Sequence, residues 1–213
     1  MKIPDIFNKI KNKNVIVVGD TMLDSYIIGK VNRQSPEAPV PIVNVLKESK
    51  KLGGAANVIM NLKSLGLNPI LCSVVGDDES GRNIIRLIED NKLESDGIVV
   101  EPRRKTTVKK RVIVKKNHVL RIDDEITEPI NRNTRNLLIN KIISFTNESD
   151  ILIFQDYDKG LINKKLIDQV RSINNIFIAA DPKFKNFNDY KDVDLFKPNL
   201  NEISYSLNIK DNS

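Results

Sequence analysis

The chain has 213 residues, of which 40% are hydrophobic and 29% charged, and it carries a net charge of +6. This length fits one globular domain that buries about 70% of its unfolded surface. No apolar run approaches the roughly 20 residues that a membrane span requires. The single cysteine, Cys72, excludes an internal disulfide and is expected to be a buried, inert thiol.

The N-terminal residues and the distribution of basic and aromatic residues bear on the location of the protein and on its partners. The sequence does not open on the apolar core of a secretion signal, so we expect a cytoplasmic protein. The densest basic stretch is 103–121, but no Phe, Tyr or Trp occurs between Glu101 and Ser144. Bases would therefore have no aromatic ring to stack on there. We expect neither a nucleic acid nor a membrane as a partner.

Apolar runs and helical periodicities alternate along most of the chain. Residues 15–18 are a continuous β-branched run that ends at Gly19-Asp20, which is typical of a buried parallel strand. The same patterns predict helices at 55–65, 79–91, 132–146 and 163–172, and strands at 69–75, 151–154 and 176–180. Strands that alternate with helices of this length predict an α/β fold with a doubly wound, mostly parallel sheet.

The first interruption of this alternation is residues 26–46. Pro36, Pro39 and Pro41 stand between short stretches of β-forming residues. Proline cannot donate a hydrogen bond to a sheet, so we expect no central strand in this segment.

The second interruption is residues 106–123, which predict a β-hairpin. Its arms are expected at 106–115 and 119–123, with the turn at 116–118 and an exposed His118 at the tip. Together the two interruptions predict a small second sheet that stands away from the main one.

Glycine and aspartate gather near the predicted start of the first helix. Gly53-Gly54 precedes that helix and Asn57 lies in its first turn, so backbone N–H groups there could receive an oxygen-rich ligand, or the pair could be a plain turn. Asp20 follows the first strand, with Asp24 four residues later. Carboxylates at this edge of a parallel sheet are placed to bind sugar hydroxyls, or they could simply shape a turn.

Two further polar sets also have alternative interpretations. Lys109 and Arg111 lie on one face of the hairpin's first arm, about 7 Å apart, and could clamp an anion or form a solvated face. Asn199, Leu200, Asn201 and Glu202 follow Pro198 at a helix start. They could organise a hydrated Mg²⁺ beside a nucleotide, or cap the helix. No G-x-x-x-x-G-K-[ST] loop and no G-x-G-x-x-G after the first strand occurs, which argues against Walker-type and classical dinucleotide enzymes.

In combination, these motifs resemble the ribokinase-like carbohydrate kinases of the PfkB group. The resemblance extends from Asn14 to Glu202 and rests on the order of four strings: 17–24, 53–66, 76–81 and 199–202. More selective strings are similar to the heptose 7-phosphate kinases of the bacterial ADP-heptose pathway, which phosphorylate O1 of D-glycero-β-D-manno-heptose 7-phosphate for the lipopolysaccharide core. These strings are 35–41, 107–112, 121–125, 156–160 and 181–183.

The resemblance implies one kinase domain over 1–213, with ATP and Mg²⁺ as cofactors. It implies that sugar hydroxyls are held by Asp20, Asp24, Gly53, Gly54 and Asn57, and that residues 199–202 serve Mg²⁺ and the ATP phosphates. The β insertions, at about 25–46 and 105–124, would form a lid over the sugar and a possible homodimer interface. We add the hypothesis that Arg33, Lys109 and Arg111 bind the phosphate already present on the sugar.

One departure from the family limits these expectations. The family's catalytic aspartate lies in a G-x-G-D motif near the C-terminus, and this sequence, which ends at 210–213, contains none. We therefore expect an incomplete ribokinase-like sheet and a chain that is close to inactive alone unless a separate C-terminal segment supplies the rest. The general base alone contributes about 10²–10⁴ in rate. The alternatives are a family kinase for another sugar, such as ribose or a fructose phosphate, and a noncatalytic sugar-phosphate-binding remnant.

Overall fold

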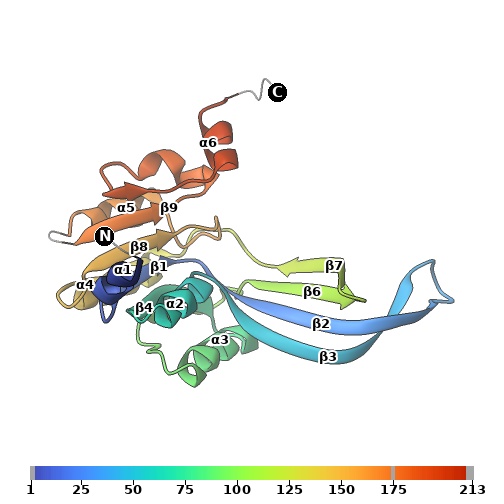
Figure 1. The fold of residues 1–213 in the computed structure, drawn as a ribbon. Helices are drawn as coiled ribbons and strands as arrows, with labels where there is room; N and C mark the ends of the chain where they lie inside the picture. Colours follow the sequence, from blue (N-terminus) through green and yellow to red (C-terminus); the bar gives the residue numbers. More distant parts are fainter. Residues whose placement is uncertain (1–2, 174–175, 210–213) are drawn as a thin grey trace.

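A computed structural model describes residues 3–173 and 176–209, and its strands form two sheets (Figure 1). The first, here called the main sheet, has six strands in the order β10-β9-β8-β1-β4-β5, and all of its strand pairs are parallel. The strands are β1 (Asn14–Gly19), β4 (Asn68–Gly76), β5 (Ile98–Glu101), β8 (Ile151–Gln155), β9 (Phe177–Asp181) and β10 (Leu195–Phe196).

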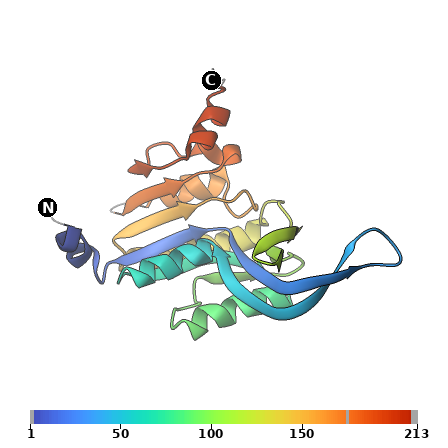
Figure 2. The ribbon, with the colours of Figure 1, turned by 45° about the vertical axis from the view of Figure 1, so that its right-hand side comes forward.

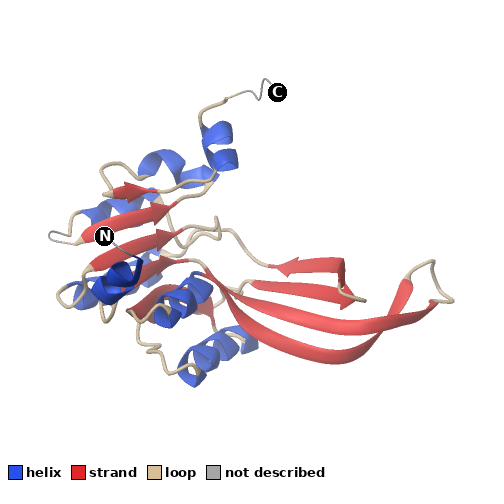
Figure 3. Cartoon of the chain, viewed as in Figure 1, coloured by secondary structure: helices blue, strands red, loops and turns tan. Residues whose placement is uncertain are grey.

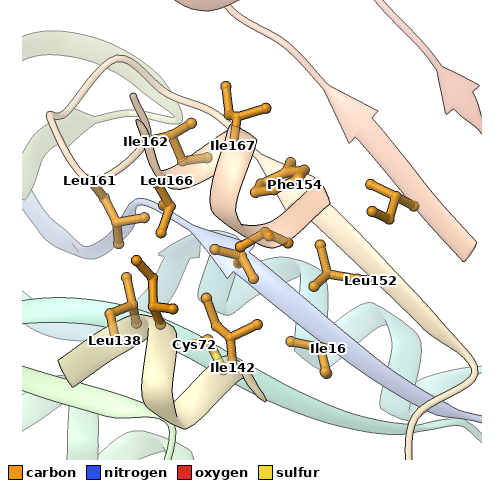
Figure 4. Close-up of a cluster of buried hydrophobic side chains, with 14 of the residues drawn as sticks. Ile16, Cys72, Leu138, Ile142, Leu152, Phe154, Leu161, Ile162, Leu166 and Ile167 are labelled. Carbon is orange, nitrogen blue, oxygen red and sulfur yellow. The ribbon is translucent and has the colours of Figure 1, made fainter. Parts of the chain in front are cut away.

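Helices cover both faces of the main sheet, which is why its strands are apolar throughout. One face packs against α4 (Arg132–Thr146) and α5 (Lys164–Arg171), in the cluster drawn in Figure 4. The other packs against α2 (Ala55–Ser64) and α3 (Glu79–Asp90). Alternate residues of β1 point into the two clusters, Ile16 into the first and Val17 into the second. The predicted doubly wound α/β fold is confirmed.

The second sheet, here called the arm, has four strands in the order β3-β2-β6-β7. They are β2 (Thr21–Gln34), β3 (Pro41–Gly54), β6 (Val108–Val114) and β7 (Asn117–Asp124). The arm extends well beyond the main sheet in Figures 1 and 2. Figure 3 shows helices around the main sheet. Among the residues described in that figure, no helix lies beside the outer half of the arm.

The expectation that residues 26–46 contain no central strand is wrong. The long strand β2 lies between β3 and β6, so it is an inner strand of the arm. The prolines do not oppose this arrangement, because Pro36 and Pro39 lie in the loop after β2 and Pro41 is the first residue of the edge strand β3. Proline is tolerated at both kinds of position.

The second hairpin forms as predicted, but its turn is displaced. Val114 pairs with Asn117, so the turn consists of Lys115 and Lys116, and His118 lies in β7 opposite Ile113. Both turn residues have positive φ values, 51° and 71°. Two-residue hairpin loops of this kind usually contain Asn or Gly, so two lysines gave no turn signal in the sequence.

The remaining elements were not predicted, because they are short or have weak periodicity. They are α1 (Ile3–Ile10), the strands β5 and β10, the 3-10 helix η1 (Phe184–Asp189) and the extent of α6 (Leu200–Ser206). Cys72 is fully buried, and burial raises the pKa of its thiol to about 12, as expected for an inert side chain. No helix within the described ranges has the length and hydrophobicity of a membrane span.

Candidate functional site

Asp20 lies directly after β1 and is bound by the loop that follows β8. Its Oδ2 accepts hydrogen bonds from the backbone N–H groups of Tyr157 (3.0 Å) and Lys159 (3.2 Å), and its Oδ1 accepts one from Leu161 (3.1 Å). The side chain is buried, and it therefore fixes this loop at the carboxyl edge of the main sheet.

The environment of Asp20 favours its protonated form. Burial, followed by the nearby carboxylate of Asp156, raises the pKa of Asp20 to about 6, although the three backbone hydrogen bonds oppose the shift. Asp156 itself accepts hydrogen bonds from the Tyr190 hydroxyl (2.8 Å) and the Asn186 amide (2.9 Å). Two acidic side chains are thus held close together beneath the candidate site.

The glycine pair brings the start of α2 against Asp20 and Asp24. The carbonyl oxygen of Asp20 accepts a hydrogen bond from the Ala55 N–H at 2.9 Å. A Cβ atom at Gly54, whose φ is +58°, would lie 2.4 Å from that carbonyl oxygen, and one at Gly53 would lie 2.7 Å from Asp24 Oδ2. At Gly54, only glycine permits this close approach to a backbone oxygen. The structure therefore brings together four of the residues that sequence analysis assigned to the sugar.

One face of the arm carries paired charges beside this point. Arg111 Nη1 lies 2.6 Å from Asp24 Oδ1. Lys109 Nζ lies 3.1 Å from Asp123 Oδ2 and 3.3 Å from Glu125 Oε2. Lys109 and Arg111 therefore lie on one face of the arm, and each of these two cations is paired with a carboxylate. Their binding of an anion stays a prediction.

A chain of charges joins this polar face to the loop that holds Asp20. Glu125 contacts Lys109 through one carboxylate oxygen and Lys159 Nζ, at 2.6 Å, through the other. Burial raises the pKa of Glu125, but hydrogen bonds and charge interactions with both lysines outweigh it, and the pKa is lowered overall. Lys159 also donates its backbone N–H to Asp20. The arm and the main sheet are therefore connected at the candidate site.

Two predicted site residues, both in the described part of the chain, form no hydrogen bond or ion pair with this cluster. Arg33 is exposed near the far end of β2, roughly 30 Å from Asp24 at about 3.3 Å per residue. Asn57 is exposed on α2 and lines a surface groove with Lys51, Leu52 and Met60. Within one copy of the chain, Arg33 is therefore not brought beside Asp24 and Arg111.

Residues 199–202 form the N-terminus of α6, and their side chains cap it. Asn199 Oδ1 accepts a hydrogen bond from the Glu202 N–H (2.9 Å), and Glu202 Oε2 accepts one from the Asn199 N–H (2.7 Å). Lys183 binds the other carboxylate oxygen of Glu202. The described residues contain no group of three or more metal-ligating side chains. This arrangement does not fit direct coordination of Mg²⁺, because each of these oxygens already has a protein partner.

Sequence analysis assigned no role to Glu125, Asp156 or Lys159. The strings 121–125 and 156–160 were noticed only as part of the family resemblance. Their roles depend on contacts between segments far apart in sequence, such as the 34-residue separation of Lys159 and Glu125. No local pattern contains that information.

A parallel sheet with helices on both faces and a β arm beside its carboxyl edge is the architecture of known sugar kinases. Phosphofructokinase-2 from Escherichia coli, in its tetrameric inhibited form, superposes with a TM-score of 0.71 at 16% identity, covering 92% of this chain and 64% of that one. A carbohydrate kinase from Agrobacterium tumefaciens gives a TM-score of 0.63 at 18% identity, covering 93% and 64%. At these identities the similarity shows the fold alone.

The sequence identifies the family. Residues 12–213 match the pfkB family of carbohydrate kinases, and the chain belongs to that family. It is 39% identical over 201 residues to the bifunctional protein HldE of Helicobacter acinonychis (strain Sheeba), covering 93% of this chain and 43% of that protein. It is 38% identical to HldE of Aliarcobacter butzleri (strain RM4018), covering 93% and 42%. The chain thus spans less than half the length of these curated relatives.

Proposed function

We propose that this chain is the sugar-binding part of an ATP-dependent sugar-phosphate kinase that phosphorylates O1 of D-glycero-β-D-manno-heptose 7-phosphate. The observation that carries the proposal is the juxtaposition of Asp24, Gly53 and Arg111. It places a carboxylate and a close-approach glycine, suited to sugar hydroxyls, next to a guanidinium suited to a phosphate. The similarity to HldE proteins supports a heptose over other sugars.

The arm has the position of a lid in this proposal, at about 25–46 and 105–124. Asp24 and Arg111 contact the sugar and its phosphate from the arm, while Gly53 and Gly54 approach from the start of α2. Asp20 acts on the sugar site through the 157–161 backbone, because both of its carboxylate oxygens are occupied there. Lys109 joins the phosphate site when the ligand competes with Asp123 and Glu125 for its ammonium group.

ATP and Mg²⁺ belong to the proposal for the whole kinase. Residues 199–202 are the segment assigned to them, through backbone groups and water, since the side-chain oxygens of Asn199 and Glu202 already have partners. The metal ion would neutralise charge on the phosphates of the donor. No step of phosphoryl transfer is assigned to residues of this chain.

Binding experiments test the sugar assignment directly. The purified chain is titrated by calorimetry with heptose 7-phosphate, fructose 6-phosphate and ribose, with circular dichroism as a check of folding. We expect selective binding of heptose 7-phosphate. Preference for fructose 6-phosphate or ribose would favour a family kinase for another sugar. A folded chain that binds none of the three would contradict the proposal.

Arg111→Ala separates phosphate recognition from sugar recognition. Loss of a charge-assisted, bidentate-capable group should weaken heptose 7-phosphate binding by about 10-fold or more. Binding of the unphosphorylated heptose should change much less. An equal loss for both sugars would remove Arg111 from the phosphate site.

We also propose that the arm forms a homodimer interface. The arm exposes apolar side chains on β3 and β7, among them Val45, Leu46, Leu120 and Ile122, each between 46% and 61% exposed. Exposed apolar groups gathered in this way mark association surfaces. Light scattering on Leu120→Lys/Ile122→Lys should show a monomer where the unmodified chain is a dimer.

A further inference from the structure

The polar face of the arm contains an aromatic ring between two cations. Tyr26 lies in β2, in register with Ser49 of β3 and Arg111 of β6. The Arg111 Cζ atom lies 5.4 Å from the centre of the Tyr26 ring, and the Lys51 Nζ atom lies 5.5 Å from it. Both distances are within the range of cation–π attraction.

Strand pairing places these side chains on the face that carries Asp24. Lys51 is the register partner of Asp24 across β2 and β3, and Lys109 is its partner across β2 and β6. Paired residues of neighbouring strands share a face, as do residues two apart in one strand. Tyr26, Lys51, Lys109 and Arg111 therefore surround Asp24 on one surface.

The cations of this surface differ in how they are neutralised. Arg111 is paired with Asp24, and Lys109 with Asp123 and Glu125. Lys51 is exposed, and among residues 3–173 and 176–209 it forms no ion pair with a carboxylate. An aromatic ring holds a cation without cancelling its charge, so Lys51 is oriented and still available to an anion.

We propose that Lys51 is a further ligand of the substrate's phosphate group, and that Tyr26 is a positioning residue that holds Lys51 and Arg111 beside Asp24. This inference rests on the proposed sugar-phosphate function and adds two residues to that site. The phosphate binds Lys51 first, because Lys51 has no carboxylate partner to give up. Arg111 binds the phosphate next and gives up its contact with Asp24.

The test measures the affinity of the full chain for heptose 7-phosphate and for the unphosphorylated heptose by calorimetry. Lys51→Gln should weaken binding of the phosphorylated sugar about 10-fold and leave the other within about 2-fold, as expected for one charge-assisted contact. The matched control is Lys50→Gln. Lys50 is adjacent in β3 but points to the opposite face, where its Nζ lies 3.5 Å from Glu79 Oε1, so both affinities should stay unchanged.

Tyr26 is tested by replacing its hydroxyl and its ring separately. Tyr26→Phe keeps the ring and should bind both sugars within about 2-fold of the unmodified chain, whereas Tyr26→Leu should lose about 3- to 5-fold for the phosphorylated sugar alone. A purely structural role would reduce both affinities together. Circular dichroism of each variant confirms that it is folded, and Tyr26→Met tests the loss of the ring if Tyr26→Leu does not fold.

The outcomes distinguish this inference from the proposed function. If the unmodified chain prefers heptose 7-phosphate and Lys51→Gln behaves like Lys50→Gln, the inference is overturned while the proposed function stands. If the unmodified chain and Lys50→Gln bind neither heptose 7-phosphate nor any other sugar phosphate, both are overturned. Selective loss in Lys51→Gln and Tyr26→Leu, with binding retained in Tyr26→Phe, supports the inference.

Discussion

The main sheet and the arm bury their side chains to very different extents. Five of the six residues of β1 are buried, whereas β2 is buried mainly over its first three residues and β7 has no buried residue. The main sheet is stabilised by apolar packing on both faces. The arm depends on backbone pairing and on ion pairs near its base. The difference suggests that fold stability resides in the main sheet, while the arm is free to carry ligand-binding charges.

The largest expected effect tests this contrast in the main sheet. Phe154 in β8 is fully buried and packs against the Tyr190 ring, with centroids 5.7 Å apart. Phe154→Ala should lower the free energy of unfolding by about 3–5 kcal/mol because it leaves a cavity. Ile28→Ala in the arm, where the side chain is 37% exposed, should cost under about 1 kcal/mol. Chemical denaturation measures both, and equal losses would contradict the contrast.

The junction of the two sheets should give the next largest effect. Gly54→Ala places a Cβ 2.4 Å from the Asp20 carbonyl oxygen, at a φ of +58°. We expect a loss of about 2–3 kcal/mol from backbone strain and steric overlap, together with loss of sugar-phosphate binding. Gly66→Ala is the control, since its φ is +85° but the nearest atom, Lys11 Cγ, is 3.4 Å away. It should cost less and leave binding intact.

Asp20 should make the stability of the chain depend on pH. Its pKa in the folded state is about 6, above the unfolded value near 3.8. The folded state therefore binds the proton more tightly, and the stability gained from this is fully present below about pH 4 and lost as pH rises through 6. The advantage of the unmodified chain over Asp20→Asn should thus shrink by on the order of 2 kcal/mol between pH 4 and 7. Denaturation curves at pH 4, 5.5 and 7 measure it, and a constant difference would contradict the shift.

The smallest effect is expected at the tip of the second hairpin. Lys115 and Lys116 both have positive φ values, which glycine adopts at no steric cost. Lys116→Gly should raise the free energy of unfolding by about 0.5–1 kcal/mol, because relief of the left-handed backbone outweighs the greater freedom of glycine in the unfolded chain. Thermal denaturation would detect it as a small increase in Tm, and no increase would indicate that the arm unfolds separately from the main sheet.

The predicted and observed structures agree best where burial is greatest. The helix 132–146 and the strand at 151–154 were predicted to within one residue, because a strand covered on both faces must be apolar throughout and Asn131 caps the helix that precedes it. Agreement is poorest in the arm, where the strands β2 and β3 have exposed polar residues and no continuous apolar run. Their length comes from pairing with each other, which a single strand's sequence does not record.

The candidate site was predicted in part for the same reason. Gly53, Gly54 and Asp20 stand next to strand and helix ends that the sequence marks clearly, so their proximity could be inferred. The contact between Asp24 and Arg111 joins residues 87 positions apart, and the one between Lys159 and Glu125 joins two separate loops. The register of the strands determines which cation forms an ion pair with which carboxylate. The distance of Arg33 from the cluster likewise follows from the length of β2.

The sequence alone determined the α/β class, the two β insertions, the family and the glycine-aspartate pattern at the edge of the sheet. These features are local, because each is set by the periodicity or the backbone freedom of a short segment. Only the tertiary structure decided that Asp20 binds a loop, that Glu202 caps a helix, and that Tyr26 lies between Lys51 and Arg111. A polar side chain could form hydrogen bonds or ion pairs with many others of similar chemistry. Only the packing of distant segments determines which of these partners lies within contact distance.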